Sequence, residues 1–452
     1  MMKRLLAALT LGLASFAGAA SAQLEVNIQD GVFQPTPIAI PDFTADGVEP
    51  EIARQISDVV RADLESTGLF TITPQSAHIQ TDLDIEVAPR FADWKIIKTD
   101  ALAVGSVERI TVDGVEFLRG SVRLWDVYGE DLMRLDGQPG RRFRTQPEDW
   151  RRIAHKISDA IYTRLTGETG YFDTRIVYIA ETGPKDRRVK RLAIMDSDGA
   201  NVQYLTSGTF TVLTPRFSPE AQQITYMSYE STQPRVYLYD LKRGRQEVLG
   251  NFRNMTFAPR FSRDGKSVLL TQAINGNSDI YIMDLVTRRT RRLTDDPAID
   301  TSPSMSPDGR EIVFTSDRGG SPQLYVMNTN GTRRTCPSGG QDLACRITFG
   351  SGRYSTPVWS PRGDLIAFTK QSRGRFHIGV IGTDGTGERL LSESYLDEGP
   401  DWSPNGRVIT FFREPFPGAS PKLYSVDLTG RNLRLMKTPT DASDPAWSPL
   451  LQ

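Results

Sequence analysis

The side chains that most often carry out catalysis are present, but not in the groupings that catalysis requires. The three histidines, His78, His155 and His377, are far apart and have no metal-ligand spacing. The sequence has no Gly-x-Ser-x-Gly nucleophile motif, no His-Glu-x-x-His zinc motif and no Gly-x-x-x-x-Gly-Lys-Ser/Thr phosphate loop. The residues therefore favour binding over catalysis, and we expect no enzyme activity.

One short acidic motif is similar to a metal site. Asp196-Ser197-Asp198-Gly199 matches the beginning of a calcium loop, but it lacks the Glu that closes such a loop and falls where a hairpin turn is expected. We expect no cofactor. A cation such as calcium, held by acidic residues at the centre of the fold described below, is the one alternative.

The chain has only two cysteines, Cys336 and Cys345. In an oxidising compartment such a pair can close a loop as a disulfide, and no other cysteine competes for either partner. We expect a disulfide between them.

A Pro-x-x-Ser element, followed by Pro in five copies and by a nearby Gly in four, recurs six times and organises most of the chain. The spacings between its prolines are 44, 44, 54, 43 and 45 residues, and the long interval contains both cysteines. Short β-rich runs with polar turns follow each copy, and four strands per repeat of about 40–45 residues is typical of a propeller blade. The copies begin at Pro215, Pro259, Pro303, Pro357, Pro400 and Pro445.

The two ends of the repeat region complement each other. The first β run, residues 176–180, has no Pro-x-x-Ser strand before it, and the last such strand, residues 445–449, has almost nothing after it. Pairing them closes a ring of six blades and protects two sheet edges. The fold class is therefore mainly β, a six-bladed β-propeller over residues 169–452.

Residues 23–168 lack the repeat and predict a small α/β domain. Helical periodicity occurs over residues 49–67 and 147–165, and a shorter helix is expected at 91–97. Strands are expected at 69–73 and 101–107, with a hairpin or strand pair over 115–128 that turns near Arg119-Gly120.

Residues 1–22 have the layout of a secretory signal peptide. Lys3 and Arg4 precede an apolar run, and Ala20-Ser21-Ala22 is a small-x-small cleavage signal. We therefore expect an exported, periplasmic protein that begins at Gln23. The net charge of −1 gives no reason to expect nucleic acid as a partner.

Together these features resemble the TolB family, the periplasmic component of the Tol-Pal system of Gram-negative bacteria. The most specific matches are the helix residues 155–162, the run Leu165-Thr166-Gly167 and the segment 170–176. The resemblance implies a non-catalytic adaptor that binds the lipoprotein Pal through the propeller and TolA through the extreme N-terminus. It implies a role in outer-membrane integrity and in constriction during cell division. We expect a monomer that meets membranes only through these partners.

The resemblance assigns two binding regions to this chain. The TolA segment is short, alternates apolar and polar residues, and either adds to a partner's sheet or pairs within its own domain. The Pal site is expected in loops before the inner strands, which crowd one mouth of the channel. The assigned TolA residues are Gln23, Leu24, Glu25, Val26, Asn27 and Ile28; the Pal residues are Met255, Thr256, Phe257, Ala258, Asp300, Thr301, Ser302, Tyr354, Ser355, Glu398 and Asp444.

Two other function classes remain as alternatives. A channel-site hydrolase needs converging acid–base or metal residues, and only carboxylates are evident at the mouth. A carbohydrate or peptidoglycan binder needs aromatic platforms, for which Tyr354 and Phe257 are thin support. The aromatic and Met residues that follow the repeat prolines are expected in the core between blades.

Overall fold

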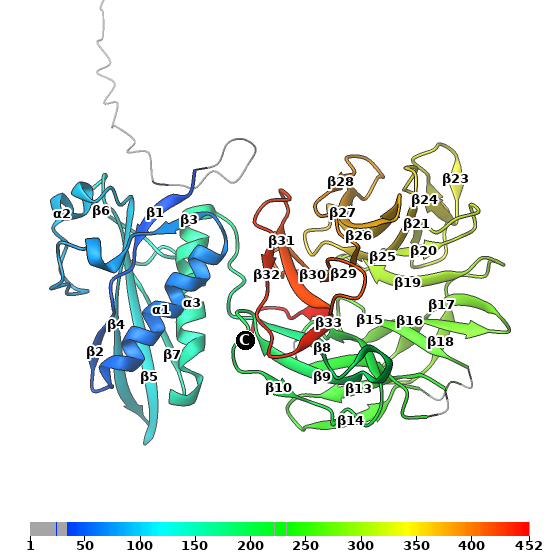
Figure 1. Cartoon of the computed structure of the whole chain (residues 1–452), viewed down its shortest axis with the longest axis horizontal. Coiled ribbons are helices and arrows are strands. Elements are labelled where there is room, and N and C mark those ends of the chain that lie inside the picture. Colours follow the sequence, from blue (N-terminus) through cyan, green and yellow to red (C-terminus); the bar gives the residue numbers. More distant parts are fainter. Residues whose placement is uncertain are drawn as a thin grey trace, which may run out of the picture.

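The computed structural model describes residues 24, 34–220, 222–231, 233–250, 252 and 254–451. The predicted signal peptide and most of the predicted TolA segment lie outside these residues. Figure 1 shows two bodies side by side: an α/β domain on the left and a β-propeller on the right. In the described part of the chain, no helix combines the length and the apolar character that crossing a bilayer requires.

The N-terminal domain is one mixed sheet with two long helices against it. The central strand order is β3-β1-β4-β5-β6, while β2 pairs with β4 and β7 with β5. The strands are β1 (Thr36–Ala39), β2 (Thr44–Asp46), β3 (Phe70–Ile72), β4 (Ala101–Val112), β5 (Val115–Asp126), β6 (Asp131–Met133) and β7 (Arg141–Thr145). The helices are α1 (Pro50–Ser66), α2 (Phe91–Ile96) and α3 (Trp150–Thr166), with 3₁₀ turns η1 (Gln75–Ala77) and η2 (Pro147–Asp149).

The predicted hairpin near Arg119-Gly120 is wrong. Residues 115–126 form the single strand β5, and the tight turn lies one strand earlier, at Asp113 and Gly114, which both have positive φ. Gly120 serves packing instead: a Cβ there would lie 2.2 Å from Cγ2 of Ile153 on α3. The glycine therefore lets the helix approach the sheet closely.

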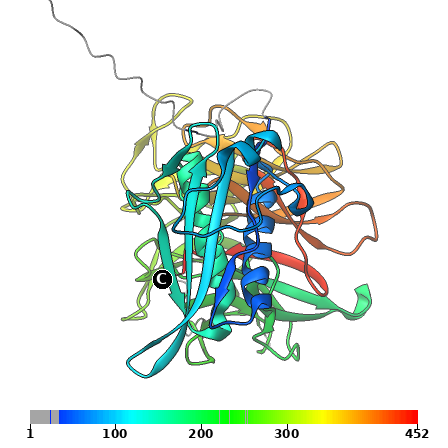
Figure 2. The ribbon, with the colours of Figure 1, turned by 90° about the vertical axis from the view of Figure 1, so that its left-hand side faces the viewer.

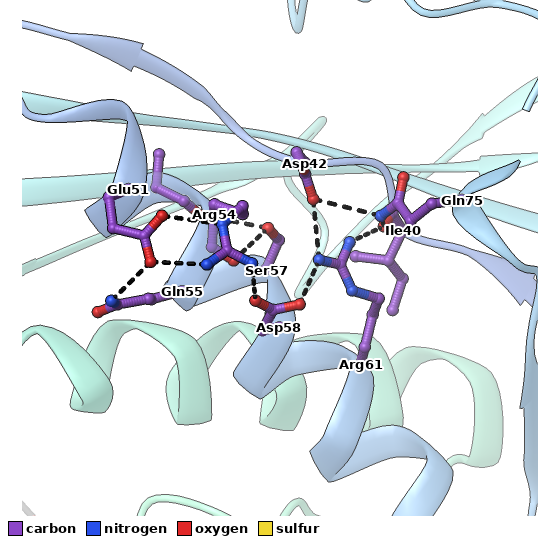
Figure 3. Close-up of polar contacts among 10 residues, drawn as sticks. Ile40, Asp42, Glu51, Arg54, Gln55, Ser57, Asp58, Arg61 and Gln75 are labelled. Carbon is purple, nitrogen blue, oxygen red and sulfur yellow. Dashed lines mark hydrogen bonds and ion pairs between the residues drawn. The ribbon is translucent and has the colours of Figure 1, made fainter.

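Helix α1 is tied to the strand that follows the N-terminal segment by a polar network (Figure 3). Arg61 donates to the Ile40 carbonyl at 2.6 Å and to the carboxylates of Asp42 at 2.8 Å and Asp58 at 2.7 Å. Gln75 donates to the same carbonyl at 3.0 Å. The network fixes the end of β1 against α1, although an exposed ion pair by itself stabilises by only about 0–1 kcal/mol.

Six four-stranded sheets form the propeller, and the chain ends close the ring as predicted. The first blade has the order β10-β9-β8-β33, so the C-terminal strand β33 (Asp441–Trp447) pairs antiparallel with β8 (Arg175–Thr182). Figure 1 shows β33 in red beside the green β8. The rest of this blade is β9 (Val189–Asp196) and β10 (Gln203–Tyr204), with η3 (Lys185–Arg187) between β8 and β9.

The other five blades run from the inner to the outer strand in chain order. Blade 2 is β11 (Val212–Phe217), β12 (Gln223–Ser228), β13 (Arg235–Asp240) and β14 (Arg245–Val248); blade 3 is β15 (Thr256–Phe261), β16 (Ser267–Ile274), β17 (Asn277–Asp284) and β18 (Thr290–Arg292). Blade 4 is β19 (Asp300–Met305), β20 (Glu311–Ser316), β21 (Gln323–Asn328) and β24 (Ala344–Arg346), with an inserted hairpin of β22 (Arg334–Thr335) and β23 (Gln341–Asp342). Blade 5 is β25 (Arg353–Trp359), β26 (Leu365–Ser372), β27 (Arg375–Gly382) and β28 (Arg389–Leu390); blade 6 is β29 (Leu396–Trp402), β30 (Val408–Glu414), β31 (Lys422–Asp427) and β32 (Arg434–Leu435).

One apolar core joins the two domains. Helices α1 and α3 lie between the N-terminal sheet and the propeller (Figures 1 and 2). Ile157 and Leu165 of α3 belong to the same buried cluster as Tyr178 and Trp447 of blade 1. Because this cluster buries large apolar side chains from both domains, the hydrophobic effect holds the domains together as well as each fold.

Candidate functional site

The inner strands share a bulge three residues from their beginning. In every blade the ladder between the inner strand and its neighbour shifts register just before the repeat proline. The residue before the proline has a positive φ in each: Thr214, Ala258, Ser302, Thr356, Gly399 and Asp444. A bulge re-aims side chains at a strand end, so it sets which residues face the channel mouth.

The predicted mouth residues, except Met255, are strand residues. Thr256, Asp300 and Tyr354 lie inside β15, β19 and β25, because their backbones already pair with the next strand. The residue three before each proline is buried in every blade: Val212, Thr256, Asp300, Tyr354, Asp397 and Ala442. Three of these buried residues, Thr256, Asp300 and Tyr354, are among the predicted Pal residues, although their distance from the proline separates them from the more exposed positions.

The buried acids at this position pair with arginines of their own blades. Arg318 donates to both carboxylate oxygens of Asp300 at 2.8 and 3.1 Å, and Arg413 donates to both oxygens of Asp397 at 2.7 Å. Each guanidinium also lies over two aromatic rings of its blade. Such bidentate ion pairs are strong and directional, so Asp300 and Asp397 stabilise the strands at the mouth and do not face solvent.

Tyr354 is also internal. Its side chain is fully buried, its hydroxyl donates to Glu388 at 2.8 Å, and the Lys370 ammonium lies 4.8 Å from the ring centre. It therefore supports the mouth from within blade 5.

The accessible part of the mouth is apolar on one side. Met255 is 38% exposed and Ile299, which the sequence analysis did not assign, is 47% exposed. Phe257 is partly buried on β15 beside Met255. Ala258, Thr301, Ser302 and Ser355 are partly buried as well.

Two carboxylates, Glu398 and Asp444, lie on the other side of the mouth and have no arginine partner among the described residues. Burial, and then the nearby charges of Asp444 and Glu414, raise the pKa of Glu398 to about 7. Asp444 accepts a hydrogen bond from the backbone N–H of Thr214 at 3.2 Å. The mouth thus combines apolar surface with carboxylates that a cationic partner group can reach.

The assigned TolA segment has one described residue. Leu24 packs, partly buried, against the core cluster of the N-terminal domain. Gln23, Glu25, Val26, Asn27 and Ile28 lie outside the described residues.

A polar cluster crosses the domain interface, and it contains the sequence motif that is similar to a calcium loop. Asp63 of α1 and Asp198 of the propeller lie on either side of His155 of α3, and Arg151 contacts Asp198. Potential ligand atoms of His155, Asp196 and Asp198 lie within 4.8 Å of one another. Because Arg151 already neutralises Asp198, and Asn201 donates to Asp196 at 2.7 Å, we interpret the cluster as an ion-pair network.

Cys336 and Cys345 form a disulfide that joins the inserted hairpin to β24. Their Cα atoms are 5.1 Å apart, and Cys345 is buried in the pairing of β24 with β21. The disulfide is therefore on the outer side of blade 4, away from the inner strands.

The comparisons with known proteins cover both domains. The model of the TolB amino-terminal domain matches residues 24–133, and that of the TolB beta propeller domain matches residues 162–451. The Tol-Pal system protein TolB of Paramagnetospirillum magneticum is 53% identical over 438 residues, which are 96% of this chain and 94% of the relative. The crystal structure of TolB from Acinetobacter baumannii has a TM-score of 0.75 and 30% identity, and the match covers 94% of this chain and all of that one. The chain therefore belongs to the TolB family, and its role is in the Tol-Pal system.

Proposed function

We propose that this protein is a periplasmic, non-catalytic adaptor that binds Pal at the acidic and apolar channel mouth and TolA through residues 23–28. Membership of the TolB family supports the system, and the mouth supports a protein as the ligand. In this proposal the protein reaches membranes only through its partners, supports outer-membrane integrity and acts during constriction at cell division.

The observation that carries the proposal is the difference between buried and accessible side chains at the mouth. The acids with arginine partners are buried, whereas Met255, Phe257 and Ile299 offer apolar contact across the mouth from Glu398 and Asp444. Apolar anchors surrounded by polar groups are typical of protein interfaces. Because the propeller is rigid, these side chains need not be ordered on binding, and little conformational entropy is lost.

Calorimetry against the soluble domain of the same organism's Pal tests the site. Phe257→Ala should weaken binding by about fivefold or more, since truncating an interface anchor costs more than about 1 kcal/mol. Val286→Ala, in the same blade but 87% exposed on the β17–β18 turn, is the matched control and should bind normally. Equal affinity for Phe257→Ala and Val286→Ala would remove the mouth as the Pal site.

The TolA assignment needs its own test, because the segment has two possible pairings. Deleting residues 23–28 should abolish binding to the soluble domain of TolA and leave the affinity for Pal within a few-fold. If TolA still binds the shortened chain, the segment serves its own domain instead.

A further inference from the structure

The opposite end of the channel holds a second cavity. It has a volume of about 470 Å³ and is lined by the ends of the inner strands of all six blades, where the Ser-Pro turns begin. The residue that follows the repeat proline lines it in five of the six blades: Arg216, Arg260, Ser304, Val358 and Asp401. This cavity is distinct from the mouth proposed for Pal, because the inner strands run from one to the other.

The cavity carries an excess of positive charge. Three arginines, Arg216, Arg260 and Arg263, line it, whereas Asp401 is the one acidic residue among its described lining. A low-dielectric wall around like charges strengthens their field and attracts a counter-ion.

Asp401 compensates only one of these arginines. Arg260 of blade 3 reaches Asp401 of blade 6, on the facing side of the ring, with its Nη1 3.2 Å from Oδ1. The other oxygen of Asp401 accepts a hydrogen bond from the backbone N–H of Trp447 at 2.8 Å. Both oxygens of this carboxylate are thus engaged.

Arg216 has no carboxylate partner among the residues that the structure describes. Its guanidinium donates a hydrogen bond to the carbonyl of Pro215 at 2.6 Å. Burial, and then the charge of Arg216, lower the pKa of Arg260 to about 10, so the two guanidiniums are close enough to repel each other. A partly buried pair of cations of this kind is stabilised by an anion that bridges it.

We propose that this cavity is an oxyanion site, in which Arg216 and Arg260 together bind a small free phosphate or carboxylate. Planar guanidiniums match both groups by paired N–H donors, which is why arginine is favoured over lysine for them. Ser304 adds a hydroxyl donor, because its Oγ accepts from the backbone N–H of Trp359 at 3.0 Å and keeps its own proton to donate. The site requires neither Pal nor TolA.

Calorimetry with inorganic phosphate, and separately with citrate, tests the proposal on the full chain in a chloride-free buffer. Arg216→Gln should weaken binding of the anion by about tenfold or more, since it removes a charge-assisted donor pair. Arg243→Gln is the matched control, because Arg243 is in the same blade with a side chain 76% exposed, and it removes the same formal charge. That control should bind the anion like the unmodified protein.

The variant Asp401→Asn should change the affinity for the anion in the opposite direction to Arg216→Gln. It removes the competing carboxylate and keeps an oxygen that can accept from Trp447, so anion affinity should rise several-fold. A merely structural role of Asp401 predicts weaker binding instead. A thermal unfolding midpoint that rises with phosphate in Asp401→Asn more than in the parent is a second readout.

The results separate the two anion sources and decide the proposal. Tighter binding of phosphate than of citrate assigns a phosphate ligand, and the reverse assigns a carboxylate. No binding of either anion up to about 10 mM, a range that corresponds to less than about 3 kcal/mol, overturns the proposal. Equal affinities for Arg216→Gln and Arg243→Gln overturn it as well, because the attraction would then be general.

Discussion

Nδ1 of His155 lies 2.8 Å from Oδ2 of Asp63, and the opposite ring nitrogen faces Asp198 of the propeller at 3.9 Å. A single imidazole, buried to all but 2%, thus lies between carboxylates of both domains. Burial alone would lower the pKa of His155, but the charge and hydrogen bond of Asp63 and the charge of Asp198 outweigh it and raise that pKa to about 9. The imidazolium therefore links the two domains at neutral pH.

The stability of the protein should consequently fall with rising pH. The pKa of His155 rises from its ordinary value of 6.5 to about 9 on folding, so its contribution is complete below about pH 6.5 and is lost as pH passes 9. The loss should be about 3 kcal/mol, measured by urea unfolding at both ends of this range. His155→Gln should remove this pH dependence, whereas His377→Gln, whose ring contacts the Ser392 carbonyl, should retain it. An unchanged slope in His155→Gln would contradict the prediction.

Glu398 should lower the stability with rising pH in the same direction as His155, but over a more acidic part of the pH range. Its folded pKa of about 7 exceeds the ordinary value of 4.5 for a glutamate, so the fold favours the neutral acid and loses stability as pH rises from 4.5 to 7. Glu398→Gln should raise the free energy of unfolding at pH 8 by up to about 3 kcal/mol and leave it nearly unchanged at pH 4. Glu393→Gln is the control, because Glu393 lies on the connection from β28 to β29, five residues before Glu398, and its side chain is 61% exposed. A gain that is the same at both pH values would refute the titration of Glu398 as its cause.

Gly120 should be intolerant of a single added methyl group. Its Cβ would overlap Ile153 of α3, and overpacking of this kind costs about 1–3 kcal/mol. Ile153→Ala removes the clashing Cγ2, so the double variant Gly120→Ala with Ile153→Ala should be more stable than the sum of the single losses predicts. Chemical denaturation of the four proteins measures this coupling. Strict additivity would show that close packing is not why glycine occupies the position.

Reduction of the Cys336–Cys345 disulfide should act locally. The hairpin of β22 and β23 lies outside the six-stranded ring of inner strands and pairs with no strand of another blade among the described residues. Cys336→Ser with Cys345→Ser should increase amide exchange in residues 334–346 and leave the inner strand β19 protected. Loss of protection throughout blade 4 would mean that the disulfide supports the blade itself.

The sequence predicted the propeller because the repeat proline and its turn recur at a nearly constant spacing. It also predicted the pairing of the two chain ends, since each lacks what the other supplies. The bulge before each proline was not predictable from composition, because residues as different as Thr214, Ala258 and Asp444 adopt the same left-handed backbone there. For that reason Asp300 and Tyr354 were grouped with exposed residues, although their side chains point into the blades.

The N-terminal domain shows a second limit. A glycine inside a β-rich run is as typical of a close approach as of a turn, so Gly120 alone could not locate the hairpin. The Asp113-Gly114 pair is the stronger turn signal, and the structure places the turn there. The interface cluster of His155, Asp63 and Asp198 joins residues far apart in the chain, and only the packing of α1, α3 and blade 1 brings them together.

The closure of blade 1 by β33 also sets the order in which the molecule can form. A ribosome must make almost the whole chain before β8 acquires its inner neighbour, so blade 1 stays open at one edge during synthesis. Packing of the N-terminal domain against the propeller is delayed as well, because Trp447 of β33 belongs to the apolar core against which α3 packs. A chain interrupted before residue 441 would carry both an unpaired strand and an uncovered apolar helix face, the two features by which proteases and chaperones distinguish unfinished proteins from finished ones.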